Sequence, residues 1–86
     1  MSPQARTLIS IVTPCYNEQE NVNECYEAIR RTFERDLPGD DYEHIFCDND
    51  SRDRTVEILR AIAARDARRV DYRLVSRFAD DDLNFD

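Results

Sequence analysis

Long apolar segments are missing from this sequence of 86 residues. Its uninterrupted apolar runs are only a few residues long, whereas a helix that crosses a bilayer needs roughly 18 apolar residues. Residues 1–6 also lack the apolar stretch of a secretion signal. We therefore expect a cytoplasmic chain without a membrane segment.

Glycine is almost absent, since Gly39 is the single one and it does not follow the first predicted strand. The P-loop and the GxGxxG dinucleotide motif both need several glycines after a strand, because only then can the backbone approach phosphate groups closely. Both motifs are thus excluded. A nucleotide bound by this chain has to be recognised mainly by side chains.

Cysteines are few and widely spaced, at positions 15, 25 and 47. Their odd number and spacing fit no disulfide framework, no CxxC redox pair and no zinc site. We expect reduced thiols that pack as small hydrophobic groups, and Cys15, beside a proline at a strand end, is the one to test for reactivity. His44 lies three residues from Cys47 on a predicted strand, so their side chains point to opposite faces and form no catalytic pair. We expect His44 to be half-exposed.

Positive charge is also in short supply, and the formal net charge is −7. This charge repels phosphate backbones and anionic lipid, so we expect no nucleic-acid partner. A phosphorylated ligand would need a metal ion, local arginines or backbone N–H groups to offset the repulsion. With 41% hydrophobic residues the chain can form a small folded core.

Apolar patterning predicts three strands separated by two helices. Strands are expected near residues 8–13, 43–48 and 71–76, the first of them buried on both faces and stopped by Pro14. Alternation of strands and helices is typical of parallel strands joined by right-handed crossovers. The predicted fold class is therefore α/β, with three parallel strands and two crossover helices.

Both predicted helices have an apolar stripe and a candidate cap. Asn21 can cap the first helix and, with Glu24, fits a variant of the capping box. Ser51 or Asp53 can cap the second helix. The apolar stripe of the first helix follows helical spacing and consists of Val22, Cys25, Tyr26, Ile29 and Phe33.

Two polar loops follow the first two predicted strands, and ligands of α/β sheets bind beyond the carboxyl ends of the strands. Tyr16 offers a ring for base stacking, Asn17 and Glu18 offer polar groups for a ribose or base, and Asp48 can accept a hydrogen bond from a base. Plain packing remains the alternative for Tyr16, and a structural turn role remains the alternative for Asp48. For Asp53 we favour a helix cap over a ligand contact.

These loops resemble two motifs of family 2 glycosyltransferases. The first is Ser10-Ile-Val-Thr-Pro-Cys-Tyr-Asn-Glu18 with Glu20-Asn-Val22 after it, and the second is Asp48-Asn-Asp-Ser-Arg-Asp-Arg-Thr55. The resemblance covers residues 7–77. The residues of both motifs are most similar to those of members that move sugars onto polyprenyl phosphates or cell-envelope glycans. The resemblance implies the amino-terminal half of a Rossmann-like GT-A fold, with an incomplete sheet, that binds a nucleoside diphosphate sugar.

The resemblance also implies roles for particular residues. The positions of Pro14, Tyr16 and Glu18 line the nucleoside pocket in the family, and that of Asp48 binds the base. Asn49 stands where a second acidic residue is common. The family's chemistry is an inverting displacement, aided by a divalent metal (Mg²⁺ or Mn²⁺) on a downstream Asp-x-Asp motif.

The sequence departs from the family pattern at two further places. Asp50 replaces a small residue or glycine, although an aspartate tolerates the left-handed conformation such a turn requires. Residues 78–86 form an acidic tail instead of a further helix and strand. No strand precedes its Asp80-Asp81-Asp82 run, so we expect a solvated tail there and no metal ligands in this chain.

Residues 1–77 are therefore interpreted as the amino-terminal part of a nucleotide-sugar-binding domain, and residues 78–86 as a tail. We expect no catalytic residues in the chain and no sugar transfer by it alone. The alternative is a non-catalytic α/β nucleotide-binding or protein-interaction fragment. An incomplete sheet also predicts self-association through an exposed sheet edge.

Overall fold

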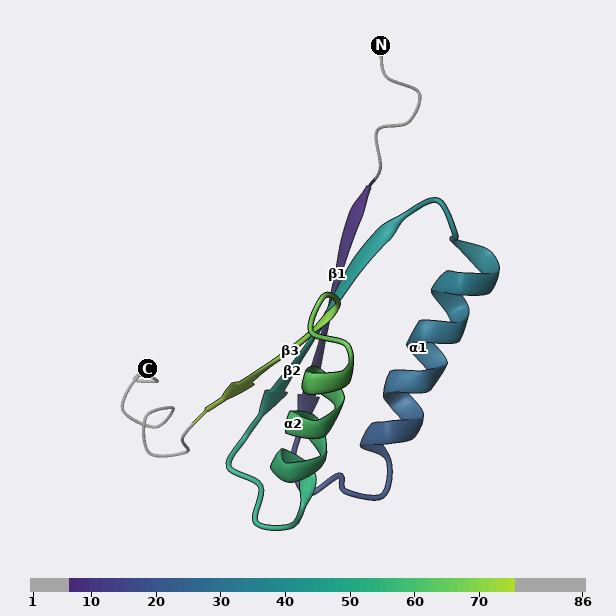
Figure 1. The fold of residues 1–86 in the computed structure, drawn as a ribbon. Helices are drawn as coiled ribbons and strands as arrows, with labels where there is room; N and C mark the ends of the chain where they lie inside the picture. The colour runs from purple at the N-terminus through teal and green to yellow at the C-terminus, as the bar shows by residue number, and fades with distance from the viewer. Residues whose placement is uncertain (1–6, 76–86) are drawn as a thin grey trace.

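The computed structural model describes residues 7–75, and these form a three-stranded sheet with two helices (Figure 1). Strands β1 (Leu8–Cys15), β2 (Asp41–Asp48) and β3 (Val70–Leu74) are all parallel and lie in the order β1-β2-β3. The predicted α/β fold class, with three parallel strands and two connecting helices, is confirmed.

Helices α1 (Val22–Asp36) and α2 (Thr55–Arg65) lie on the same side of the sheet (Figure 1). Alternate residues of β2 are accordingly buried, among them Phe46, while the residues between them are only partly covered. The prediction that β1 is buried on both faces is wrong, because Leu8 and Val12 are 62% and 59% exposed. Within residues 7–75 no helix covers that second face.

The core lies between the helices and the covered face of the sheet. Leu59 and Ile62, one turn apart on α2, are fully buried against Phe46. Burying a side chain of this size contributes about 1.5–3 kcal/mol each. On α1 the buried positions are Val22, Tyr26 and Phe33, which belong to the predicted apolar stripe. The core is small but continuous across both helices.

Strand β1 does not stop at Pro14, as the sequence predicts, but continues to Cys15. The carbonyl of Cys15 accepts a hydrogen bond of 2.9 Å from the N–H of Asn49, so Cys15 points its backbone groups toward β2. Successive residues of a strand alternate in this direction, so the nitrogen of Pro14 points away from β2. A proline is tolerated there because β1 is an edge of this sheet.

Helix capping differs from the prediction at both helices. Asn21 occupies the N-cap position of α1, but within the described residues its side chain caps no backbone N–H, and no capping box forms. The carbonyl of Glu18 accepts from Asn21 N and Val22 N instead, at 2.8 and 3.0 Å. For α2 the N-cap residue is Arg54, and no side chain makes a cap hydrogen bond within the described residues. Asp53 lies one residue earlier, and its Oδ1 atom accepts from the N–H of Thr55, the first residue of the helix, at 2.9 Å.

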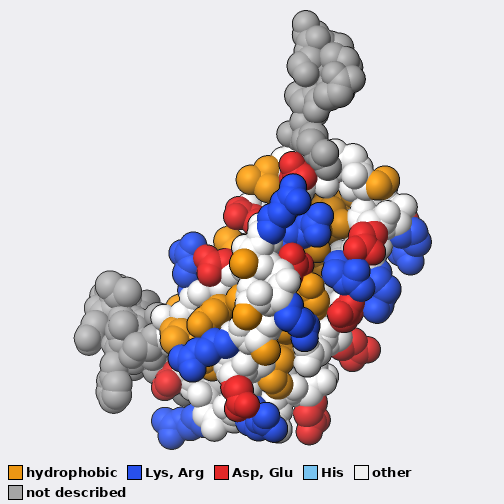
Figure 2. All heavy atoms as spheres, in the orientation of Figure 1, with side chains coloured by type: hydrophobic (Ala, Val, Ile, Leu, Met, Phe, Trp, Pro, Cys, Tyr) orange, Lys and Arg blue, Asp and Glu red, His pale blue; other side chains and the backbone are white. Residues whose placement is uncertain are grey.

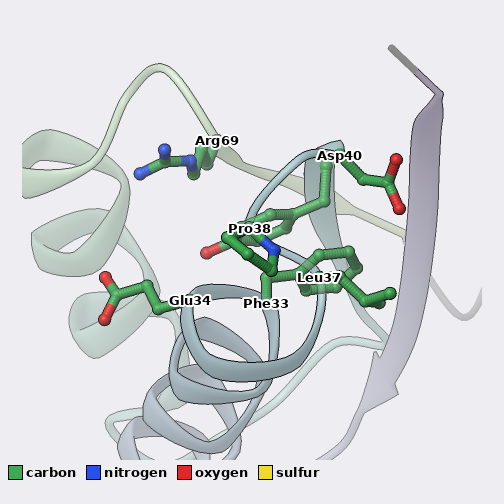
Figure 3. Close-up of a pocket in the computed structure, with 7 residues that line it drawn as sticks. Phe33, Glu34, Leu37, Pro38, Asp40 and Arg69 are labelled. Carbon is green, nitrogen blue, oxygen red and sulfur yellow. The ribbon is translucent and has the colours of Figure 1, made fainter.

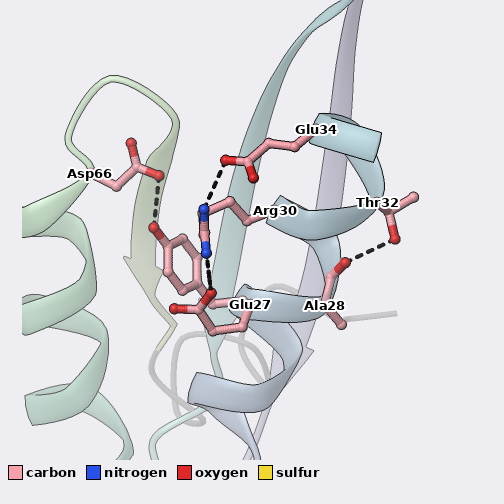
Figure 4. Close-up of polar contacts among 7 residues, drawn as sticks. Glu27, Ala28, Arg30, Thr32, Glu34 and Asp66 are labelled. Carbon is pink, nitrogen blue, oxygen red and sulfur yellow. Dashed lines mark hydrogen bonds and ion pairs between the residues drawn. The ribbon is translucent and has the colours of Figure 1, made fainter. Parts of the chain in front are cut away.

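The helical face carries interspersed charges of both signs with apolar side chains between them (Figure 2). Arg30 on α1 pairs with Glu27 and Glu34, both at 2.8 Å, and Tyr26 donates a hydrogen bond of 2.9 Å to Asp66 (Figure 4). Exposed ion pairs one helical turn apart contribute only about 0.3–0.5 kcal/mol each. The apolar core therefore dominates the stability of this unit.

Two expectations from the sequence lie partly or wholly outside the described residues. Strand β3 ends at Leu74, and the predicted end near residue 76 falls just beyond the described range. The acidic tail at residues 78–86, with Asp80-Asp81-Asp82, also lies outside it. Between residues 7 and 75, none of the helices has the length and apolarity needed to cross a membrane.

Candidate functional site

The two polar loops lie side by side at one end of the sheet, at the bottom of Figure 1. Cys15 and Asp48, the last residues of β1 and β2, are paired in register. Residues 16–21 leave β1 and residues 49–54 leave β2, so the loops start next to each other. The expected convergence of the two motifs at the carboxyl ends of the strands is present in the structure.

Each loop contains one residue with left-handed backbone geometry. The φ angle is 52° at Asn17 and 63° at Asp50. Asparagine and aspartate are the non-glycine residues that adopt this region most readily. Asp50 thus takes the place of the usual small residue without loss of the turn, as the sequence predicts.

Two side chains of the second loop and one at the start of α2 accept hydrogen bonds from the backbone of the first loop. Ser51 Oγ accepts from Asn17 N at 2.8 Å, and Thr55 Oγ1 accepts from Glu18 N at 2.8 Å. Asp53 Oδ2 accepts from Gln19 N at 3.2 Å. Three consecutive backbone N–H groups are therefore held by side chains spaced two residues apart.

The first loop binds the second in return. Asn17 Oδ1 accepts from Arg52 N at 2.8 Å, and Gln19 Oε1 accepts from Arg54 N at 2.9 Å. We call these interacting side chains the loop clamp, and its members are Asn17, Gln19, Ser51, Asp53 and Thr55. Sequence reasoning missed Gln19 and Thr55. The available signal was the alternation of small polar residues at 51, 53 and 55, opposite amides at 17 and 19.

Asp53 serves both the helix and the clamp. Its Oδ1 accepts from the N–H and the hydroxyl of Thr55, while its Oδ2 accepts from Gln19 N. Desolvation opposes ionisation, but the hydrogen bonds from Thr55 and Gln19 outweigh it and lower the pKa of Asp53 below its ordinary value. The carboxylate is thus charged at neutral pH and acts as an acceptor throughout.

Asp48 is buried, with 1% of its surface exposed. Its Oδ2 accepts from Ser51 N at 2.9 Å and its Oδ1 accepts from the Ser51 hydroxyl. The turn role that the sequence left open for Asp48 is therefore present. A carboxylate has about four acceptor positions, so about two remain. Asp48 also lines a cavity of about 250 Å³, together with Asp50, Ser51, Val56, Leu74 and Val75.

Pro14 and Glu18 line a different cavity, of about 210 Å³, on the β1–α1 side. Cys15 lies in its wall, and burial foremost raises the pKa of its thiol to about 12. A buried thiol with so high a pKa is unreactive at neutral pH, so Cys15 packs as a small hydrophobic group. The structure thus does not bring Pro14 and Glu18 into one cavity with Asp48.

Tyr16, Asn17 and Asn49 line neither cavity. Tyr16 is 40% exposed, so part of its side chain is open to a ligand. Base stacking and plain packing both remain predictions for this residue. Asn17 holds the second loop through its Oδ1 atom, which leaves its Nδ2 group for other partners. Asn49 Oδ1 is buried and accepts no hydrogen bond from the described part of the chain.

The prediction of a half-exposed His44 is wrong, since this side chain is fully buried. His44 Nε2 lies 2.8 Å from Thr13 Oγ1, and the ring packs 4.0 Å from that of Phe46. Nδ1 has no partner among residues 7–75. Burial lowers the pKa of His44 to about 4, so the ring is neutral at physiological pH. His44 is buried because both helices cover its face of the sheet. The sequence pattern alone does not show which face the helices cover, since that depends on the strand order.

No group of three histidine, cysteine or acidic side chains in residues 7–75 is arranged to hold a metal ion. The described residues therefore do not fit the divalent metal implied by the family resemblance. A separate cavity lies at the other end of the sheet, where Arg69 and Glu34 flank Pro38 and the ring of Phe33 stacks on Tyr42 (Figure 3). It is remote from both polar loops.

Fold and loops together define an open α/β unit of the kind that binds ligands beyond the carboxyl ends of its strands. Residues 10–79 match the family described as Glycosyl transferase family 2. This match covers most of the chain, and the chain belongs to that family. No solved structure matches it.

Curated relatives agree with this assignment. Undecaprenyl-phosphate 4-deoxy-4-formamido-L-arabinose transferase of Edwardsiella ictaluri is 40% identical over 70 residues, which cover 80% of this chain and 21% of that protein. The Pseudomonas aeruginosa protein of the same name is 40% identical over 67 residues, covering 77% of this chain and 19% of its own. An uncharacterised glycosyltransferase of Bacillus subtilis is 37% identical over 59 residues, covering 69% and 18%. The chain spans about a fifth of these relatives.

Proposed function

We propose that this chain is the nucleotide-sugar-binding portion of an inverting glycosyltransferase with a GT-A fold. Residues 1–77 would form the amino-terminal part of the domain, and residues 78–86 a tail. The observation that carries the proposal is the pairing of two polar family motifs, side by side at the carboxyl ends of β1 and β2. Parallel α/β sheets bind ligands at this place.

The donor would be a nucleoside diphosphate sugar, and the acceptor a lipid phosphate or a glycan. Relatives named as undecaprenyl-phosphate sugar transferases support a lipid-phosphate acceptor. The scarcity of glycine supports recognition of the nucleoside by side chains rather than by a glycine-rich phosphate loop. A cytoplasmic location is part of this proposal, because nucleotide sugars would have to reach the loops.

In this proposal the base stacks on Tyr16 and donates an N–H to Asp48. Asp48 is buried but lines the cavity on the β3 side, and a base would reach its carboxylate through that cavity. Glu18 and the free amide group of Asn17 would contact the ribose. Pro14, in the separate cavity on the β1–α1 side, and Asn49, which lines neither cavity, would contact the nucleoside from the end of β1 and the start of the second loop.

We also propose that the chain alone transfers no sugar. An inverting displacement needs a base that deprotonates the acceptor and a cation that stabilises the departing diphosphate. Residues 7–75 provide no metal cluster. In a longer protein Mg²⁺ or Mn²⁺ would offset the charge of the diphosphate, while the residues of this chain would bind and orient the nucleoside. Turnover of a nucleotide sugar by the purified chain in the presence of Mn²⁺ would contradict this.

Nucleotide binding is tested by a nuclear magnetic resonance titration with uridine and guanosine diphosphates. A hydrogen bond to a charged acceptor contributes about 1.5–3 kcal/mol, so Asp48→Asn should weaken binding roughly ten- to a hundredfold. Asp71→Asn, on the exposed surface of β3, is the matched control and should bind as the wild type. Shifts centred on the cavity beside Arg69, or binding unchanged by Asp48→Asn, would disprove this site.

A non-catalytic fragment is the second candidate. The observation that favours it is the loop clamp, in which both loops satisfy each other's backbone groups without any ligand. Absence of binding to either diphosphate at millimolar concentration would decide for this candidate. We further propose self-association through a strand edge, since β1 and β3 each have one side without a partner strand within residues 7–75.

A further inference from the structure

We infer that Ser51, Asp53 and Thr55 act as positioning residues for the nucleotide. They hold the first loop in its binding conformation before a ligand arrives. Asp53 and Thr55, which line neither cavity beside the loops, act through Tyr16 and Glu18 rather than by touching the nucleotide. The inference rests on the proposed function. It gives the Ser-x-Asp-x-Thr part of the second motif the role of holding the first loop. The sequence alone suggests only a helix cap for these residues.

The geometry of the clamp carries this inference. The N–H groups of residues 17, 18 and 19 each donate to one of the three side chains, at 2.8, 2.8 and 3.2 Å. Three consecutive N–H groups with acceptors restrict the backbone on either side of Glu18. Tyr16 directly precedes this held segment, and its backbone lies between Cys15, whose carbonyl is bonded to Asn49 N, and Asn17.

Thr55 is the anchored member of the clamp. It is fully buried as the first residue of α2, and its Oγ1 accepts from Glu18 N while donating to Asp53. Because α2 packs on the sheet through Leu59 and Ile62, the hydroxyl of Thr55 has a fixed position relative to the core. The first loop is therefore attached to a rigid element and not only to another loop.

The left-handed backbone at Asn17 gives a second reason. Such a conformation is unfavourable for a residue other than glycine and persists where surrounding bonds enforce it. Here the enforcing bonds run from Asn17 N to Ser51 and from Arg52 N to Asn17. Without the clamp the loop would sample other conformations, and binding would have to restore the order at the expense of affinity.

The test compares Thr55→Val, which removes the hydroxyl, with Thr55→Ser, which keeps it. Thr32→Val is the matched control, because Thr32 loses a hydrogen bond to the carbonyl of Ala28 on the exposed side of α1 (Figure 4). Affinity for uridine and guanosine diphosphates and the exchange rate of the Glu18 amide are measured for each. Urea unfolding is recorded in parallel, so that lost stability is separated from lost affinity.

We expect Thr55→Val to bind roughly five- to tenfold more weakly, because the held amide of Glu18 loses its acceptor. The Glu18 amide should exchange faster, while Thr55→Ser stays within about twofold of the wild type and Thr32→Val is unchanged. Gln19→Ala removes an exposed part of the clamp and should weaken binding about two- to threefold, even where Thr55→Val fails to fold.

Two outcomes separate this inference from the proposed function. If the wild type binds and both Thr55→Val and Gln19→Ala bind equally well, the positioning role is refuted while nucleotide binding stands. If the wild type binds neither diphosphate, the proposed function fails and the inference fails with it. A Thr55→Ser variant as weak as Thr55→Val would also refute it, because the hydroxyl would then not be the group that matters.

Discussion

Acidification should destabilise this unit through His44 once the pH falls below the ordinary pKa of histidine. The ring is fully buried beside Phe46, and burial lowers its pKa from 6.5 to about 4. In the unfolded chain the histidine has its ordinary pKa, so below 6.5 the unfolded state binds a proton that the folded state resists. The stability from the neutral ring is complete above pH 6.5 and is lost as the pH falls toward 4.

The magnitude follows from the two pKa values. Each pKa unit corresponds to about 1.4 kcal/mol, so the free energy of unfolding should fall by about 2 kcal/mol between about pH 8 and pH 5. The complete loss, below the folded pKa, amounts to about 3 kcal/mol. A domain of this size has only about 3–5 kcal/mol to lose. The unit should therefore be close to unfolding near pH 4.

The assay is urea denaturation followed by circular dichroism at a series of pH values. His44→Gln is the informative variant, since glutamine can still bond to Thr13 Oγ1 but does not titrate in this range. Above about pH 5 its unfolding free energy should be nearly independent of pH, because carboxylates titrate mainly below this value. If the wild type and His44→Gln lose stability in parallel between about pH 7 and pH 5, the reasoning on His44 is refuted.

Three further predictions concern packing and association. Tyr42→Phe should raise the unfolding free energy by about 1 kcal/mol, because the buried hydroxyl has no partner in residues 7–75 and the ring stacked on Phe33 remains. Tyr26→Phe should lower it by about 1 kcal/mol, because it removes the hydrogen bond to Asp66. In thermal denaturation, a lower stability of Tyr42→Phe would contradict the first assignment, and an unchanged stability of Tyr26→Phe would contradict the second. Leu74→Lys places a charge on the exposed edge strand β3 and should abolish self-association, which is measured as concentration-dependent sedimentation. If the variant associates as the wild type does, the contact between copies does not involve β3.

Periodicity was sufficient to predict the elements and their order. The α1 stripe with Val22, Tyr26 and Phe33 is buried as its spacing indicates, because helical phase alone decides which side chains share a face. The parallel pairing of the strands followed from the alternation of strands and helices. These are local or chain-order properties, and a single sequence contains them.

Coverage of the sheet was not predictable in the same way. Both connections run in the same direction across the sheet, so both helices lie on one face and leave Leu8 and Val12 exposed. The apolar residues of β1 do not distinguish a strand that is covered on one face in the described unit from a strand that is covered on both. The continuation of β1 through Pro14 likewise depends on its edge position, which only the strand order reveals.

The loops show a similar division. The sequence placed Asp48 and Tyr16 at neighbouring strand ends, and the register of β1 and β2 confirms this neighbourhood. Their ligand contacts remain predictions. The alternation of polar residues at 51, 53 and 55 was visible in the sequence, but their partners were not, because the bonds of the clamp join residues 34 to 37 positions apart, as between Asn17 and Ser51 or Glu18 and Thr55. Such partners are fixed by loop conformation, which propensities do not encode.

The sheet order β1-β2-β3 has a consequence for how the polypeptide folds during synthesis. Each strand pairs with its neighbour in sequence across one crossover helix, so that partner residues such as Leu8 and Asp41 lie 33 positions apart. Parallel pairings over such distances form more slowly than hairpin contacts, although amino-terminal units fold first as the chain emerges from the ribosome. Strand β1 can therefore pair only after β2 has been made, and within residues 7–75 its outer edge has no partner strand.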